Sequence, residues 1–282
     1  MVHAANRVSA RHGWEWVKSG VASFRKEPAL WVAMAFVYLA IALVLGLIPF
    51  VGWLILMLFT PLCMLGALSV AQALAGPGLP PDAVPAPPVQ HDFRSLALYL
   101  REHFMRAARR LFQGFSDETK LVPIMVIGTL LLGGLVAIKI LAQLLKVGGA
   151  ALPAMLSGSV GPSVWLTALL GLLVVLSLEA LLLMAFLYTV PLIAFRREHP
   201  LPSIELSFGG ASTNMGAFSI FVSVFAVAGE IMRLLFLLLI FPFDYLAFLV
   251  AGLVVLPVFI AALHASYQDL YAPSPVPVPP PG

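Results

Sequence analysis

The chain of 282 residues is 61% hydrophobic and only 10% charged, with a formal net charge of +3. A soluble domain has about 45–50% apolar and about 25% charged residues, so this chain lacks the charge needed to cover its apolar surface in water. The composition excludes an ordinary soluble protein and predicts an all-α integral membrane protein, for which lipid is the solvent.

Six apolar stretches are long enough to span a bilayer, which requires about 20 residues each. We expect them at residues 29–47, 51–74, 121–145, 163–193, 217–240 and 244–264. The expected organisation is an amphipathic segment (1–28), a first hairpin (29–75), a proline-rich linker (76–90), a basic amphipathic helix (91–120), a second hairpin (121–194), an interfacial segment (195–216), a third hairpin (217–264) and a proline-rich tail (265–282).

The basic residues predict the orientation of these hairpins. All but three of the 16 Lys and Arg residues lie in the segments 1–28, 75–120 and 194–216, which an even number of spans places on one side. Lys and Arg accumulate in cytoplasmic loops, so both ends of the chain are expected in the cytoplasm. This distribution accounts for the basic character of the chain without a nucleic-acid partner.

Three stretches have helical periodicity but are too polar to span, and each precedes a pair of spans. They are expected to lie in the plane of the cytoplasmic interface as amphipathic helices. Their apolar faces are Trp14, Val17, Val21 and Phe24; then Phe93, Leu96, Leu100, Phe104, Ala107 and Leu111; then Ile204, Phe208, Ala211 and Met215, where Gly209 and Gly210 weaken the helix.

The second of these helices carries a cluster of arginines: Arg94, Arg101, Arg106, Arg109 and Arg110. Each basic residue near an anionic membrane surface contributes about 1 kcal/mol of attraction. The cluster is therefore predicted to contact anionic lipid, and an acidic partner protein is the alternative.

Four charged residues lie inside the expected spans: Lys139, Glu179, Glu230 and Arg233. An ionisable side chain in hydrocarbon costs at least about 2.5–3.5 kcal/mol, so it normally faces a partner or a cavity. Their depths allow one intramembrane charge network that locks the third, fourth and fifth spans together. The alternatives are a polar site for a proton, an ion or a small ligand, and a contact to a partner protein.

No sequence motif for catalysis, metal binding or a cofactor is found. The six histidines have no ligand spacing, and no nucleophile elbow or glycine-rich phosphate loop is present. The single cysteine, Cys63, lies in an apolar run and is interpreted as a packing residue. We therefore expect no enzyme, no metal and no cofactor.

Three short segments resemble a family of proteobacterial inner-membrane proteins without an established activity, the BPSS-type family. They are Gly-Trp-Glu-Trp at 13–16 through Phe-Arg-Lys-Glu-Pro-Ala-Leu-Trp at 24–31, then Pro-Leu-Ile at 191–193 followed by Ile-Glu-Leu-Ser-Phe at 204–208, and the ending Ala-Ser-Tyr-Gln-Asp-Leu-Tyr at 265–271. The layout is more distantly similar to YciC-like proteins and to the membrane domain of some glycerophosphodiester phosphodiesterases. The resemblance implies a bacterial inner-membrane location and carries no activity over.

The sequence as a whole predicts a non-enzymatic accessory, scaffold or membrane-organising protein of a membrane complex, whose partners are lipids and other membrane proteins or itself. The alternative is a small transporter or channel subunit that uses the Glu and Arg residues of its spans as a polar path.

Overall fold

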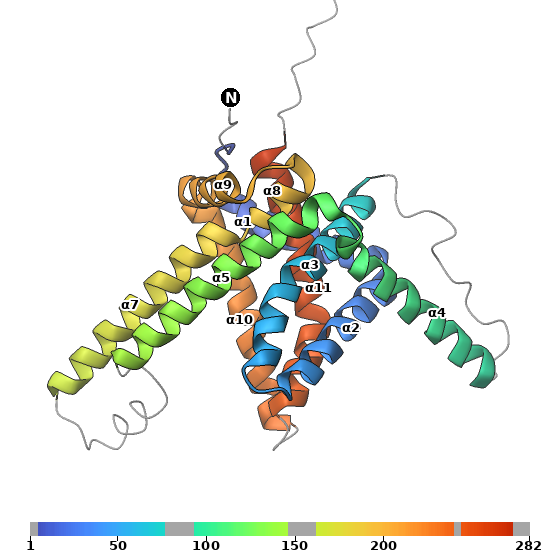
Figure 1. Cartoon of the computed structure of the whole chain (residues 1–282), viewed down its shortest axis with the longest axis horizontal. Coiled ribbons are helices and arrows are strands. Elements are labelled where there is room, and N and C mark those ends of the chain that lie inside the picture. The colour runs from blue at the N-terminus through green and yellow to red at the C-terminus, as the bar shows by residue number, and fades with distance from the viewer. Residues whose placement is uncertain (1–4, 77–92, 146–161, 240–243, 273–282) are drawn as a thin grey trace, which may run out of the picture. The chain divides into compact units, whose positions relative to one another are not determined.

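The computed structural model describes residues 5–76, 93–145, 162–239 and 244–272, and these residues form helices without any strand. The helices are α1 (Arg11–Lys26), α2 (Pro28–Gly46), α3 (Val51–Ala75), α4 (Phe93–Leu111), the 3-10 turn Phe112–Phe115, α5 (Glu118–Leu144), α7 (Pro162–Phe186), α8 (Thr189–Arg196), α9 (Pro200–Thr213), α10 (Met215–Leu239) and α11 (Asp244–Tyr271) (Figure 1). The all-α class is confirmed for this part of the chain.

Six helices of the described part are long and apolar enough to cross a membrane. They are α2, α3, α5, α7 taken together with α8, α10 and α11, so the six expected spans are found. The last one ends later than expected, because α11 continues through residues 265–271. Nearly all of the expected proline-rich linker and most of the expected tail lie outside the described residues.

The chain divides into two compact units, which are described separately. Unit 1 comprises Met1–Leu43, Cys63–Gly114 and Gly209–Gly282, and unit 2 comprises Val44–Leu62 and Phe115–Phe208. Unit 1 therefore contains α1, most of α2, half of α3, α4, α10 and α11, whereas unit 2 is built around α5, α7 and α8.

In unit 1, α1 packs against α10 and α11 through a stripe of small residues. Its buried residues are Gly13, Trp16, Val17 and Gly20, whereas Trp14 is half exposed. The predicted apolar face through Trp14 and Val21 is thus largely left uncovered by the rest of unit 1, and its assignment to the membrane interface stays a prediction. Glycines permit the close approach on the packed face: a methyl group at Gly13 would collide with the carbonyl oxygen of Ala217, and one at Gly20 with that of Val258.

The segment preceding α1 is fixed to the ends of α10 and α11 by polar side chains. Asn214, which is buried, accepts a hydrogen bond from the amide of Val8 (2.8 Å) and donates one to the carbonyl of Asn6 (2.9 Å). The Trp16 indole donates to the Asp269 carboxylate at 2.7 Å. These bonds orient α1, because they fix the segment before it at the junction of α9 and α10 and fix Trp16 at α11.

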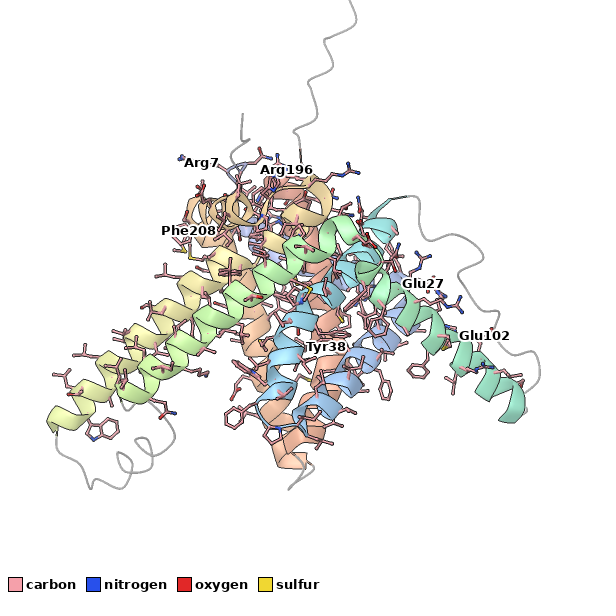
Figure 2. All side chains as sticks on the ribbon, viewed as in Figure 1. Arg7, Glu27, Tyr38, Glu102, Arg196 and Phe208 are labelled. Atoms are coloured by element: carbon pink, nitrogen blue, oxygen red, sulfur yellow. The ribbon has the colours of Figure 1, made fainter. Side chains whose placement is uncertain are left out.

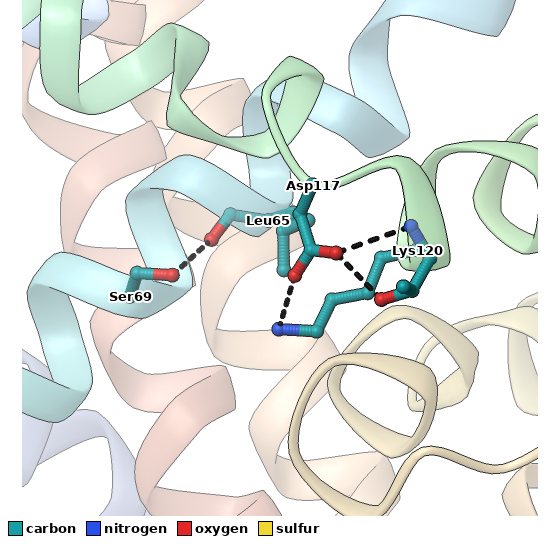
Figure 3. Close-up of polar contacts among 5 residues, drawn as sticks. Leu65, Ser69, Asp117 and Lys120 are labelled. Carbon is teal, nitrogen blue, oxygen red and sulfur yellow. Dashed lines mark hydrogen bonds and ion pairs between the residues drawn. The ribbon is translucent and has the colours of Figure 1, made fainter.

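In unit 2, α5 and α7 run side by side and antiparallel (Figure 1). They approach closely where Gly134 of α5 faces Leu182 of α7, with no room for a further methyl group. The N-terminus of α5 is capped by Asp117, which accepts hydrogen bonds from the amide and the hydroxyl of Thr119 and forms an ion pair with Lys120 at 3.0 Å (Figure 3). Such a cap satisfies amide groups that a helix start leaves without partners.

The expected fourth span is interrupted between α7 and α8, and a serine from α9 fills the break. Pro191 cannot donate to the carbonyl four residues earlier, and its ring displaces that carbonyl. One turn before Leu187 and Pro191, the hydroxyl of Ser207 from α9 lies between two backbone groups. It donates to the carbonyl of Met184 (2.8 Å) and accepts from the amide of Tyr188 (3.1 Å). These two groups would bond to each other in a continuous helix, so the serine is inserted into the hydrogen-bond ladder.

The residues of α9 that pack against the protein include only Ala211 of the face predicted for the membrane interface. Its buried residues include Ser203, Ser207 and Gly210, whereas Phe208 is exposed, as is Met215 just beyond α9. Gly210 does not break the helix. It provides the space into which the Tyr271 hydroxyl of α11 packs, and a methyl group there would collide with it.

Candidate lipid-binding helix and intramembrane charges

The helix α4 presents an exposed surface of mixed basic and apolar residues. Arg101 and Arg109 are exposed, and so are the apolar side chains Leu98, Leu100, Phe104 and Met105. Figure 2 shows the side chains projecting from this helix, with Glu102 labelled. A helix with this combination suits the boundary between headgroups and acyl chains.

The C-terminal half of α4 is anchored within unit 1. Ala107 and Leu111 are buried, and the carbonyl of Leu111 lies so close to Gly66 of α3 that a methyl group there would collide with it. Phe104 contacts Phe36 of α2, with ring centroids 5.3 Å apart. Because Phe36 is an exposed residue of a helix that is long and apolar enough to span a membrane, this contact joins the apolar edge of α4 to an exposed apolar surface of α2.

Arg106 does not share the exposed surface of α4 but turns inward. Its guanidinium lies 3.7 Å from the carboxylate of Glu27, at the junction of α1 and α2, and its side chain is only 11% exposed. Burial lowers the pKa of Arg106, and the negative charge of Glu27 opposes that effect. This arginine therefore holds α4 to the α1–α2 junction, where Lys26 also donates a hydrogen bond to the carbonyl of Leu74 at 2.6 Å.

The five arginines predicted as one contact surface thus have different positions. Arg101 and Arg109 are exposed, Arg110 is partly buried, and Arg106 is paired with Glu27. The side chain of Arg94 lies outside the described residues. Glu27 was not among the residues predicted for this site, although its position between the basic end of α1 and Pro28 at the start of α2 marks it as a junction residue.

The charged residues of the spans are found in both units. Lys139 of α5 is exposed and Glu179 of α7 is partly exposed, both in unit 2. Glu230 is an exposed residue of α10 in unit 1, and the side chain of Arg233 lies outside the described residues. Neither Lys139 nor Glu179 forms an ion pair with any residue that the structure describes. The expected network of all four charges remains a prediction.

In the described part of the chain, no group of three or more His, Cys, Asp or Glu side chains is arranged to hold a metal ion. Cys63 is buried in α3, as expected for a packing residue.

Comparison with known proteins adds no relative. No protein-family model, no curated protein and no solved structure matches the chain. The resemblance to the BPSS-type family therefore remains a proposal, and the function has to be argued from the helices themselves.

Proposed function

We propose that the chain is a non-enzymatic, membrane-organising protein of a bacterial inner membrane, and that it recruits anionic lipid through α4. The surface of α4 supports this proposal, because Arg101 and Arg109 stand among exposed apolar side chains on a helix anchored beside a membrane-spanning segment. The proposed topology has both ends and the three helices α1, α4 and α9 on the cytoplasmic side, which follows from the distribution of Lys and Arg.

The expected interaction combines two physical contributions. Apolar side chains of α4 insert among the acyl chains at about 25 cal/mol per Å² of buried area. The two exposed arginines contribute about 1 kcal/mol each near an anionic surface, about 2 kcal/mol together. Without both arginines, the preference for anionic over zwitterionic lipid should fall by roughly tenfold or more.

The test uses the full chain in lipid nanodiscs that contain phosphatidylethanolamine with a minor fraction of phosphatidylglycerol. Native mass spectrometry then measures the anionic lipid retained by the wild type and by the variant Arg101→Gln/Arg109→Gln. The matched control, Arg7→Gln/Lys18→Gln, removes the same charge from exposed positions outside α4. The proposal requires a loss in the α4 variant that the control does not share; retention equal to wild type, or an equal loss in both variants, contradicts it.

A second candidate function is that of a small transporter or channel subunit, and the charged residues of the α5–α7 hairpin favour it. A polar path needs water at Lys139, which is exposed in α5. Labelling of a Cys63→Ala/Lys139→Cys variant by a membrane-impermeant maleimide in intact cells would support this candidate. Resistance to the reagent, with full labelling after denaturation, would exclude a path at that position.

A further inference from the structure

Lys139 and Glu179 lie at nearly the same level of the α5–α7 hairpin. The contact between Gly134 and Leu182 fixes the register of this antiparallel pair. Lys139 lies five residues after Gly134 in α5, and Glu179 lies three residues before Leu182 in α7. Because the two helices are antiparallel, both steps lead in the same direction along the hairpin. At about 1.5 Å per residue, the two charged residues are therefore only about 3 Å apart along the hairpin.

Both charged residues also point to the same side of the hairpin. The register places Ile138 opposite Leu178, and Ile138 is buried. Lys139 directly follows Ile138, and Glu179 directly follows Leu178. Each step advances by about 100° around a helix, and antiparallel helices turn in opposite senses when seen from one end. The two charges consequently share one side, which we call the charged side.

The charged side is unfavourable in contact with lipid. Lys139 is exposed, Glu179 is partly exposed, and neither forms an ion pair with a described residue. Both helices are long and apolar enough to span the bilayer, so each charge left in hydrocarbon costs at least about 2.5–3.5 kcal/mol. A surface of opposite charge at the same depth would remove this cost.

We propose that the charged sides of two copies of this chain face each other, so that Lys139 of each copy pairs with Glu179 of the other. A two-fold axis along the membrane normal leaves depth unchanged and places α5 of one copy opposite α7 of the next. Because the two charges differ by only about 3 Å in depth, one rotation forms both pairs. The pair is self-complementary: the same patch supplies the cation and the anion.

The test is disulfide cross-linking between two differently tagged full-length chains, co-expressed in one cell. Both carry Cys63→Ala, which removes the only native cysteine. One chain also carries Lys139→Cys and the other Glu179→Cys. The matched control pair is Ala137→Cys and Leu181→Cys, which are likewise about 3 Å apart in depth. Ala137 precedes Ile138 and Leu181 precedes Leu182, whereas Lys139 and Glu179 each follow a residue that faces the other helix. They therefore lie on the opposite side of the hairpin.

Oxidation of isolated membranes should give a product near twice the 30.2 kDa monomer mass that carries both tags, and the control pair should not. Equal membrane levels of all four chains verify that the variants insert. Absence of the product, or an equal yield from the control pair, overturns the proposal. If the mixed pair gives no product but a Cys63→Ala chain that carries both Lys139→Cys and Glu179→Cys forms an intramolecular disulfide, the proposal is also overturned, and Lys139 and Glu179 form a pair within the hairpin.

Discussion

Replacing Ser207 by alanine tests the interpretation of the break between α7 and α8. The hydroxyl of Ser207 is fully buried and bonds to two backbone groups, the carbonyl of Met184 and the amide of Tyr188. Alanine preserves the helical propensity of α9 and removes only these two bonds. A buried backbone group left without a partner costs about 1–3 kcal/mol, so the free energy of unfolding should fall by about 2–6 kcal/mol.

The measurement is the midpoint of thermal unfolding of the purified protein in detergent, followed by tryptophan fluorescence. For a chain of this size, about 2 kcal/mol corresponds to a decrease of about 3–4 °C in the midpoint. The control is Ser212→Ala on the same helix, where an exposed hydroxyl donates to the carbonyl of Gly209 at 3.1 Å. We expect that control to stay within about 0.5 kcal/mol of wild type.

Hydrogen exchange at the Tyr188 amide provides a second, independent result. Exchange should accelerate in Ser207→Ala, because this amide loses its acceptor. If the variant instead keeps both its unfolding midpoint and its protection at Tyr188, the amide has bonded directly to the Met184 carbonyl. The break would then not depend on the serine, and our explanation of it would be refuted.

Two further predictions concern close packing and helix capping. Gly20→Ala should destabilise the protein by about 1–3 kcal/mol through the collision with α11, whereas Gly133→Ala, which meets no atom within 4 Å, should not lower the unfolding midpoint in detergent. Asp117→Ala should lower the unfolding midpoint in detergent, while Asp117→Asn should retain most of the cap. Hydrogen bonds from Thr119 and Lys120 lower the pKa of Asp117 below its ordinary value of 3.8, so this contribution should be complete at neutral pH and decline as the pH falls below that value. Equal midpoints for Asp117→Ala and wild type at pH 7 would contradict this role of the cap.

The helices were predictable from the sequence, because each apolar run that is long enough to span became a helix. The break near Tyr188 was not predicted, since the fourth span was expected to run without interruption through residues 163–193. Pro191 removes only the donor to the carbonyl of Leu187. The serine that fills the gap one turn earlier comes from another helix.

The contact faces of α1 and α9 were not predictable from apolar periodicity. That pattern selects large side chains, such as Trp14 and Phe208, which turned out to be exposed. The contacts of α1 combine Trp16 and Val17 with Gly13 and Gly20, and those of α9 include Ser207, because small residues allow backbones to approach in tightly packed helices. In the same way, the sequence could not show that Arg106 forms an ion pair while Arg101 is exposed, since only the folded chain brings Arg106 to Glu27.

The packing of α1 against α11 has a consequence for biosynthesis. The Trp16 indole meets its carboxylate acceptor across 253 residues of chain. During translation α1 therefore emerges long before α11. The face of α1 that carries Gly13 and Gly20 stays uncovered until nearly all of the spans have been inserted into the bilayer. The hydrogen bond between Trp16 and Asp269 can form only after synthesis has reached Asp269. A ribosome that stalls earlier leaves α1 accessible to membrane chaperones and proteases.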